Sequence, residues 1–293
     1  MPNLSSSQES NRMDKIPSQL FSLAAQGESG HWPLLRAHLE NISRLKDQDI
    51  HQELLSSMVK KFVALEQRVD ELLKNTLPPV VAEEIKYLGT FTPRSYDCTI
   101  LFSDVAGFTR LAERLSSGEL VEIIDAIFRA FDRVVRECQG TKIKTIGDAY
   151  MAVFGAPLAY QDHAHQAVQA ATRMVDALAG FNRSRFGLKE ERYFQCRIGI
   201  HSGTVTAGVV GEDRMQFDVF GDTVNIASRF ESAGKVGRVN ISEETRRQLP
   251  SGFLYEDRGE VPLKNKDAMK AYFVATERQY ETEDAEHGAR TPV

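Results

Sequence analysis

Residues 98–109 read CTILFSDVAGFT, an apolar run that ends in an aspartate and is followed by a glycine turn. Cys98–Phe102 has the length and composition of a buried strand. Asp104 follows directly, so a rigid strand end would hold its carboxylate in place. Gly107 opens a turn whose backbone N–H groups, with the start of the next helix, can bind phosphate oxygens. The stretch therefore predicts a strand that brings a carboxylate and an anion-binding turn to one place.

A second aspartate occurs in a similar setting. Lys142–Ile146 and Ala149–Phe154 have the pattern of strands, and Gly147-Asp148 between them has the composition of a tight turn. Taken alone, each aspartate is more often a turn former or a helix cap. Taken together, Asp104 and Asp148 supply hard oxygen ligands from neighbouring strands, which is what two Mg²⁺ or Mn²⁺ ions need. From these residues alone, both interpretations, a structural turn or cap and a site for divalent ions, stay open.

The surrounding segments alternate between strand and helix patterns, which predicts an α+β fold. Cys196–Ile200 is predicted as a strand that His201-Ser202-Gly203 turns back, Met215–Phe220 as another strand, and Asp222–Ser232 as a helix. Two more helices are predicted from apolar residues that share a face, namely Val121, Ile124, Phe128, Phe131 and Val135 in the first and Ala164, Ala167, Val168, Ala171, Val175 and Leu178 in the second.

An N-terminal helix is predicted over residues 51–76 and ends before Leu77-Pro78-Pro79. Its apolar residues are spaced three and four apart, namely Leu55, Met58, Phe62, Leu65, Val69 and Leu72. This a/d stripe, with charges between its members, favours a parallel two-stranded coiled coil. A single amphipathic helix is the alternative, because the stripe is short.

Composition and charge exclude several classes of protein. The net charge of -5 leaves no basic footprint for a nucleic-acid partner. No apolar run reaches the roughly 18 residues of a transmembrane helix, and the first ten residues lack the basic and apolar regions of a secretory signal. The chain has three cysteines, an odd and small number, and they are widely spaced at Cys98, Cys138 and Cys196. This pattern indicates reduced core thiols in a cytoplasmic protein.

Three longer runs resemble the motifs of class III nucleotide cyclases, the adenylate and guanylate cyclases. Phe102–Thr109 reads FSDVAGFT, Lys142–Ala152 reads KIKTIGDAYMA and Gln216–Arg229 reads QFDVFGDTVNIASR. The likeness covers roughly residues 94–276 and keeps the order of the motifs in the family. It implies a ferredoxin-like βαββαβ catalytic domain, preceded here by the helical or coiled-coil segment.

The resemblance also divides the chain. Residues 91–278 would form the cyclase catalytic domain and residues 51–90 a helical coiled-coil or transducer segment. Residues 1–50 form an N-terminal segment to which no activity is assigned, and residues 279–293 a flexible tail.

Several matched residues take a role in catalysis by this resemblance. Asp104 and Asp148 would hold both Mg²⁺ or Mn²⁺ ions. Asn225 would orient the ribose, and Arg229, four residues later on one helix face, would stabilise charge on the α-phosphate in the transition state.

Other matched residues would bind the triphosphate of the substrate. Gly107, Phe108 and Thr109 form the phosphate-binding turn. Lys264 would meet the terminal phosphates. The glycine that usually follows this lysine in the family is Asn265 here, so Lys266 is the alternative.

The family reads the purine at two positions, which fall on Lys144 and Asp218. Adenine offers an acceptor at N1 and a donor at the 6-amino group, and a lysine with an aspartate matches that edge. Guanine reverses the edge, and guanylate cyclases of the family tend to carry glutamate and cysteine there. The resemblance therefore implies that ATP is the substrate and cyclic AMP the product. A guanylate cyclase is the alternative.

The resemblance finally implies a homodimer with two shared active sites. In the family, the metal aspartates of a site come from one protomer, and the base-reading pair, the asparagine and the arginine come from the other. A catalytically silent regulatory module is another alternative, but such modules usually lack a metal aspartate, the asparagine or the arginine, and this chain has them all. A diguanylate cyclase is excluded because its Gly-Gly-[Asp/Glu]-Glu-Phe signature is absent.

Overall fold

A computed structural model describes residues 48–108, 115–186, 194–212, 214–264 and 266–275. The chain divides after Asn75 into two units, which we describe separately. In the first unit, helix α4 spans Gln48–Thr76 without a break and ends immediately before Leu77, as the Leu-Pro-Pro sequence predicts. The described apolar residues of its stripe, Met58, Phe62, Leu65, Val69 and Leu72, are exposed on the single chain. The coiled coil itself stays a prediction.

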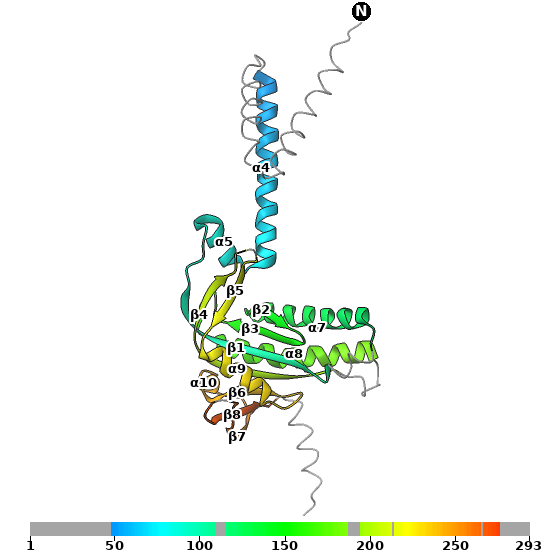
Figure 1. Ribbon diagram of the computed structural model, residues 1–293, viewed down its shortest axis with the longest axis vertical. Helices are drawn as coiled ribbons and strands as arrows, with labels where there is room; N and C mark the ends of the chain where they lie inside the picture. The colour runs from blue at the N-terminus through cyan, green and yellow to red at the C-terminus, as the bar shows by residue number, and fades with distance from the viewer. Residues whose placement is uncertain (1–47, 109–114, 187–193, 213, 265, 276–293) are drawn as a thin grey trace, which may run out of the picture. The chain divides into compact units, whose positions relative to one another are not determined.

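The second unit is built on one mixed sheet with the strand order β2-β3-β1-β4-β6-β8-β7, and β5 pairs with β4 outside this path (Figure 1). The strands are β1 Arg94–Ala106, β2 Thr141–Ile146, β3 Ala149–Phe154, β4 Gln195–Val210, β5 Gln216–Phe220, β6 Val239–Ser242, β7 Tyr255–Val261 and β8 Met269–Val274. The helices are α5 Pro79–Leu88, α7 Ser117–Glu137, α8 His163–Phe186, α9 Asp222–Ser232 and α10 Glu243–Arg246.

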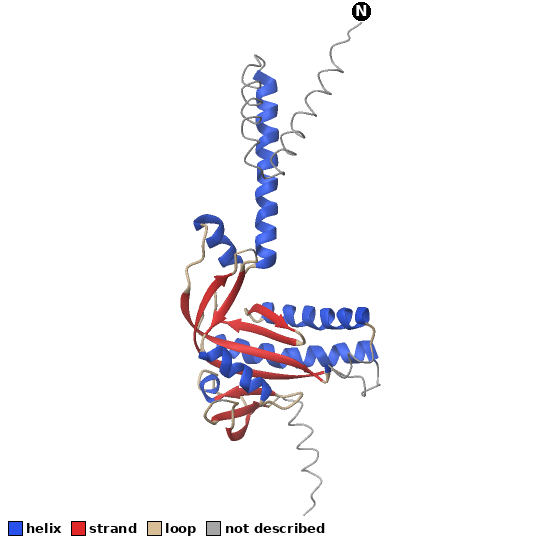
Figure 2. Ribbon diagram, in the orientation of Figure 1, coloured by secondary structure: helices blue, strands red, loops and turns tan. Residues whose placement is uncertain are grey.

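The order of elements confirms the ferredoxin-like prediction. The chain runs β1-α7-β2-β3-α8-β4, and β1 lies between β3 and β4 with both pairings antiparallel. Helices α7 and α8 lie side by side along the strands (Figure 2). A capping box begins α7, because the Ser116 hydroxyl accepts from the Glu119 amide while the Glu119 side chain accepts from Ser116.

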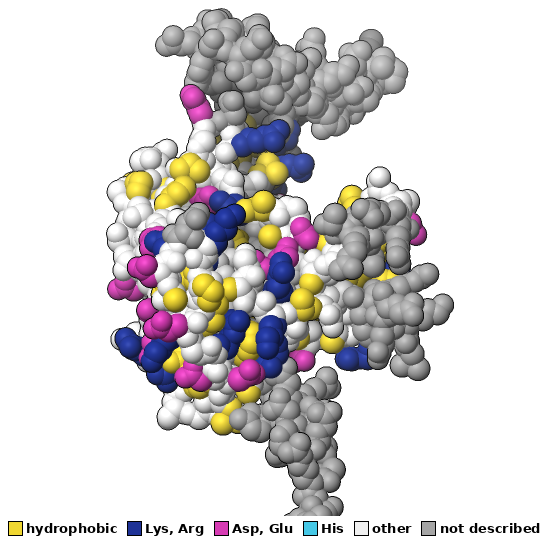
Figure 3. Space-filling model, turned by 60° about the horizontal axis from the view of Figure 1, so that its bottom comes forward, with side chains coloured by type: hydrophobic (Ala, Val, Ile, Leu, Met, Phe, Trp, Pro, Cys, Tyr) yellow, Lys and Arg dark blue, Asp and Glu magenta, His cyan; other side chains and the backbone are white. Residues whose placement is uncertain are grey.

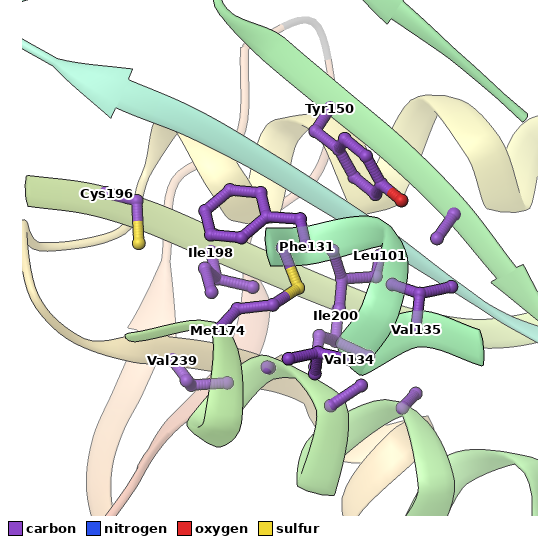
Figure 4. Packing of buried hydrophobic residues seen from close by; sticks show 14 of the residues in the cluster. Leu101, Phe131, Val134, Val135, Tyr150, Met174, Cys196, Ile198, Ile200 and Val239 are labelled. Atoms are coloured by element: carbon purple, nitrogen blue, oxygen red, sulfur yellow. The ribbon is translucent and has the colours of Figure 1, made fainter. Parts of the chain in front are cut away.

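The main core lies between the sheet and these two helices. Alternate residues of β1 and β4, such as Leu101 and Ile200, are buried there against Phe131 of α7 and Met174 of α8 (Figure 4). The intervening residues point to the other face of the sheet. That face receives α9, whose backbone comes so close that Gly199 of β4 has no room for a side chain.

Two details of the sequence prediction are wrong. Strand β4 does not turn at His201-Ser202-Gly203 but continues to Val210. The polar side chains are satisfied inside the sheet, because Ser202 Oγ lies 2.7 Å from Thr99 Oγ1 and His201 Nδ1 lies 2.8 Å from Ser242 Oγ. On α7 the predicted face is wrong at Val121, which is exposed. Phe131 and Val135 are buried and Ile124 and Phe128 pack partly against the core, as predicted, and Ile123, Ile127 and Val134 are buried as well.

The three cysteines are buried free thiols. Among the described residues, no helix has the length and apolar character that crossing a bilayer requires. On the face that Figure 3 shows, Lys and Arg side chains are interspersed with Asp and Glu, so that no broad basic surface lies there.

The close approach at Gly199 yields a stability prediction. A Cβ at this position would lie 1.9 Å from the Glu231 amide nitrogen, which is backbone and cannot rotate away. We expect Gly199→Ala to lower the free energy of unfolding by about 1–3 kcal/mol or more, as overpacking does. Thermal unfolding would show this as a fall of about 2–4 °C in Tm for each kcal/mol.

Gly180→Ala is the matched control, because this glycine lies inside α8 and a Cβ there would meet nothing within 4 Å. It should leave Tm unchanged or raise it, since alanine favours a helix over glycine by up to about 1 kcal/mol. Equal Tm values for the Gly199→Ala protein and the unmutated protein would contradict the predicted contact.

Candidate active site

The pairing of β1 with β3 brings the two predicted metal-binding aspartates together. Asp104 of β1 is in register with Ala149, the first residue of β3, and Asp148 precedes it in the β2–β3 turn. Both side chains are half-buried. Burial raises the pKa of Asp148, and the neighbouring charge of Asp104 raises it further. Two carboxylates therefore crowd one place at the end of the sheet.

Arg197 and Glu231 extend this carboxylate pair, and sequence reasoning missed both. Arg197 of β4 is in register with Asp104, and its Nη2 donates to Asp104 Oδ2 at 2.7 Å. Its Nε donates to Glu231 Oε1 of α9 at 3.0 Å. The available signal was the strand alternation: Cys196 and Ile198 are buried in the core, so Arg197 between them must face the other side of the sheet, where Asp104 lies.

The donor set fits divalent ions of the hard kind. Two carboxylates converge, and the pKa of Asp148 is raised chiefly by burial and further by the charge of Asp104, both of which a bound cation would offset. No group of three or more His, Cys, Asp or Glu side chains that could enclose a metal occurs within the described ranges.

The predicted phosphate-binding turn follows β1. Gly107 has a φ of +77°, the left-handed region that favours glycine, and it is exposed. Phe108 packs partly against the main core, which anchors the turn. Thr109 lies outside the described residues.

The two predicted base-reading residues are in direct contact. Lys144 Nζ of β2 lies 2.5 Å from Asp218 Oδ2 of β5. Asp218 is 7% exposed, and its other oxygen accepts from the Val219 amide at 2.9 Å. Phe217, the preceding residue of β5, packs edge-on against Phe91 with ring centroids 5.8 Å apart. The Asp218 carboxylate is thus held by its own strand, by a lysine and by the packing of its neighbour.

Asn225 and Arg229 lie one turn apart on α9 and, in the described part of the chain, the side chain of neither forms a hydrogen bond or ion pair. The helix begins after Gly221, which has a φ of +141°. It is held to the sheet by Thr223, whose hydroxyl donates to the Thr204 carbonyl oxygen at 2.7 Å. Two polar side chains are therefore carried on a firmly docked helix.

The two candidate lysines of the C-terminal region differ in their contacts. Lys266 Nζ lies 2.6 Å from Asp222 Oδ1 at the start of α9. Lys264 is exposed, and its ammonium has no partner among the described residues. The structure therefore leaves Lys264 available and commits Lys266 to an ion pair.

The site residues form three separate groups within one chain. Asp104 with Asp148, Lys144 with Asp218, and Asn225 with Arg229 are each brought together. No hydrogen bond or ion pair between described residues joins one of these groups to another. Within one protomer, these three groups of predicted site residues are therefore not joined to one another.

Comparison with known proteins identifies the family. The family model described as the adenylate and guanylate cyclase catalytic domain matches residues 91–276. Among curated proteins, a receptor-type guanylate cyclase of Caenorhabditis elegans is 36% identical over 234 residues. The match covers 79% of this chain and only 18% of that relative. The chain therefore spans about a fifth of the length of this relative.

Solved structures give the same family. The catalytic core of a rhodopsin-guanylyl cyclase with converted specificity, in complex with ATPαS, is 33% identical with a TM-score of 0.57 and covers 63% of this chain and 98% of its own. The adenylyl cyclase CyaB from P. aeruginosa is 28% identical with a TM-score of 0.58 and covers 64% of this chain and 98% of its own. With its matched motifs, fold and site geometry, this chain belongs to the class III nucleotide cyclases, the family of the adenylate and guanylate cyclase catalytic domain.

Proposed function

We propose that this protein is an adenylate cyclase, which converts ATP to 3′,5′-cyclic AMP and pyrophosphate at sites shared between two protomers. One observation carries the choice of base: Lys144 and Asp218 are in contact at 2.5 Å, and the aspartate is almost fully buried. A lysine donor beside a carboxylate acceptor matches the acceptor and donor on the Watson–Crick edge of adenine. Guanine would leave these groups unpaired, which a buried site penalises strongly.

A guanylate cyclase is the second candidate, because the curated relative with 36% identity is a receptor-type guanylate cyclase. Sequence identity is averaged over the whole domain, whereas only a few side chains would contact the base. Domains of equal similarity were solved with either nucleotide: the rhodopsin-guanylyl cyclase core with converted specificity with ATPαS, and the guanylate cyclase domain of RhGC from Catenaria anguillulae with GTP. We therefore give more weight to the residues that would touch the base.

Asp104 and Asp148 would hold two Mg²⁺ or Mn²⁺ ions. When bound, such ions would activate the ribose 3′ hydroxyl and neutralise the triphosphate. Phosphoryl transfer of this kind depends on positioning and charge neutralisation more than on covalent help. In this proposal Asn225 orients the ribose, and Arg229 donates to the α-phosphate as negative charge develops.

The triphosphate would be bound by the Gly107 turn and by Lys264. Gly107 is exposed and has a positive φ, a conformation in which a turn can direct backbone N–H groups toward an anion. Lys264 is favoured over Lys266 because only the latter is already paired with a carboxylate. We propose that Phe108 positions the turn through its packing, and that Thr109 contributes to the same turn.

The separation of the three groups within one protomer supports a shared site. A homodimer with a two-fold axis would place the aspartates of one protomer opposite the base-reading pair of its partner and opposite the partner's Asn225 and Arg229. The symmetry would create this arrangement at two equivalent sites. Helix α4 would assist by forming a coiled coil with its copy, because its apolar stripe is exposed on the single chain.

The proposed activity is tested by the ratio of specificity constants. We expect the purified dimer, with Mn²⁺, to form cyclic AMP from ATP with a kcat/KM well above that for GTP. The double change Lys144→Glu with Asp218→Cys should shift the ATP to GTP ratio by about 30-fold or more, since each unpaired buried group costs about 1–3 kcal/mol. Chromatographic separation of the two cyclic nucleotides measures both.

The control for that shift is Lys142→Glu, which places the same new side chain on the same strand at an exposed position. Its ratio should stay within about threefold of the unmutated protein, a difference below 1 kcal/mol. Preference of the unmutated protein for GTP would establish the guanylate cyclase instead.

The shared site is tested by mixing two inactive proteins. Asp104→Ala removes a metal-binding carboxylate, and Arg229→Ala removes a guanidinium that the other half contributes. After subunit exchange the heterodimer should regain activity, because one of its two sites then contains both intact halves. A cyclase assay of an equal mixture of the two proteins should show activity that corresponds to one working site in each heterodimer.

As a control, the two inactive proteins are assayed alone and after self-exchange. Fluorescence energy transfer between labelled protomers demonstrates that exchange took place. An inactive mixture in which heterodimers have been detected would argue for sites contained within one protomer.

The coiled coil is tested at Phe62, which is 68% exposed on the single chain. Phe62→Glu places a charge in the predicted seam, and we expect the dimer dissociation constant to rise at least about tenfold, a cost of about 1.4 kcal/mol. Lys60→Glu introduces the same residue at an exposed position outside the stripe and should change little. Sedimentation equilibrium compares them, and equal dissociation constants would favour a single amphipathic helix.

A further inference from the structure

Strand β5, which carries Asp218, is paired along one edge only. It forms an antiparallel ladder with β4 in which Asp218 lies opposite Gly208, and no other described strand pairs with it. This ladder fixes the register of β5. The rest of its position depends on how its side chains pack, because no second strand holds its other edge.

The side chains of β5 alternate between two faces. Phe217 and Val219, each 3% exposed, are buried, and Asp218 between them points the other way, toward Lys144. Because Phe217 and Asp218 are adjacent on one extended backbone, a displacement of the Phe217 ring also displaces the Asp218 carboxylate. The packing of Phe217 therefore bears directly on the contact between Asp218 and Lys144.

The ring of Phe217 packs against Phe91, which lies between α5 and β1. The two ring centroids are 5.8 Å apart and the planes meet at 88°, an edge-on arrangement that aromatic pairs favour. Phe91 is itself 5% exposed, so it forms a buried support beneath β5. It has no part in the roles assigned so far.

Phe91 is held in place by a pair of charged residues. The Arg94 guanidinium lies over its ring, 4.8 Å from the centroid, and Arg94 Nη2 is 2.6 Å from each carboxylate oxygen of Glu84. Glu84 Oε1 also accepts from the Thr92 amide at 3.1 Å. Glu84 belongs to α5, whose Val81 is fully buried, so the pair is attached to a docked helix. The segment around Phe91 is thus fixed from both sides of the ring.

We propose that Phe91 is a positioning residue for purine recognition, which holds Asp218 against Lys144 and the base through the ring of Phe217. This inference rests on the proposed base-reading role of Lys144 and Asp218 and assigns a role to a residue outside that pair. Phe91 acts only through Phe217 and Asp218. Hydrogen bonds weaken steeply when donor and acceptor are misaligned, so a small displacement of the carboxylate is enough to weaken its bond to adenine.

The test compares steady-state kinetics of the full chain, as a dimer with Mn²⁺, on ATP and on GTP. Phe91→Leu keeps an apolar side chain but removes the edge-on ring contact. We expect the ratio of kcat/KM for ATP to that for GTP to fall about three- to tenfold, comparable with the loss of one aromatic contact. The KM for ATP should rise, with kcat changing less.

The ratio separates positioning from a loss of folded protein. Both substrates are assayed on the same sample, so the fraction of folded enzyme cancels in the ratio, and a merely structural role would not move it. Guanine has no matched partner to lose, and its use should change less than that of adenine. A ratio within about twofold of the unmutated protein would overturn the proposal.

The matched control is Phe253→Leu. The ring of Phe253, between α10 and β7, stands edge-on to His165 with centroids 5.5 Å apart. Its loss should leave the ATP to GTP ratio within about twofold of the unmutated protein. An equal fall in both variants would mean that any missing aromatic contact loosens the domain, and it would overturn the positioning role.

A double-mutant cycle tests whether Phe91 acts through Asp218. In an Asp218→Ala background, Phe91→Leu should leave the ratio within about twofold, because the carboxylate that it positions is gone. A full effect in that background would overturn the proposal.

A second variant covers the case in which Phe91→Leu does not fold. The Arg94 side chain is 46% exposed, and Arg94→Lys keeps its charge but lacks the planar fork that binds Glu84 and covers the Phe91 ring. It should lower the ATP to GTP ratio in the same direction. An unchanged ratio would overturn the proposal.

Asp218→Ala alone distinguishes failure of this inference from failure of the proposed function. A lower ATP to GTP ratio in Asp218→Ala, together with an unchanged ratio in Phe91→Leu, would retain the base-reading pair and reject the role of Phe91. An unchanged ratio in Asp218→Ala would reject the base-reading pair, and with it the inference.

Discussion

The antiparallel pairing of β1 with both of its neighbours is the constraint on which the candidate site depends. Asp104 is placed beside Ala149 of β3 and opposite Arg197 of β4 by the same two ladders. One residue of slip in either ladder would turn its side chain to the wrong face. The core enforces the register, because Leu101 and Ile200 must face α7 and α8, and the charged residues are thereby left on the opposite side. The charged residues are concentrated at the site because the apolar residues occupy the opposite face of the sheet.

Much of the ferredoxin-like core could be predicted because its signals are local. The turn at Asp148 and the helix Asp222–Ser232 agree with the structure at the resolution of single residues. The strand after Cys196 was cut short, because His201, Ser202 and Gly203 have turn composition, and only partners distant in sequence, such as Thr99 and Ser242, satisfy their polar groups. Strands β6, β7 and β8 were not assigned, since short strands obtain their stability from pairing with one another and with β4.

The candidate site likewise has residues that the sequence predicts and residues that it does not. Asp104, Asp148, Lys144 and Asp218 stand in motifs, and the fold brings them together in the pairs that the motifs imply. Arg197 and Glu231 have no motif that describes their contact. A charged residue within a strand or at the end of a helix has the appearance of a solvated surface group, and its partner is known only once two segments 34 residues apart are packed together. Lys264 and Lys266 could not be separated by sequence for the same reason, because Asp222 selects one of them.

The contact between α9 and β4 at Gly199 bears on how this protein could be redesigned. Because the backbones of α9 and β4 are in direct contact at Gly199, no side chain between them can be shortened. Substitution therefore cannot adjust the distance between the two elements. Lys144 of β2 and Asp218 of β5 meet instead through their side chains, which substitution can change. Under the proposed base-reading role of Lys144 and Asp218, attempts to change the purine therefore belong on those two strands, with α9 left unaltered.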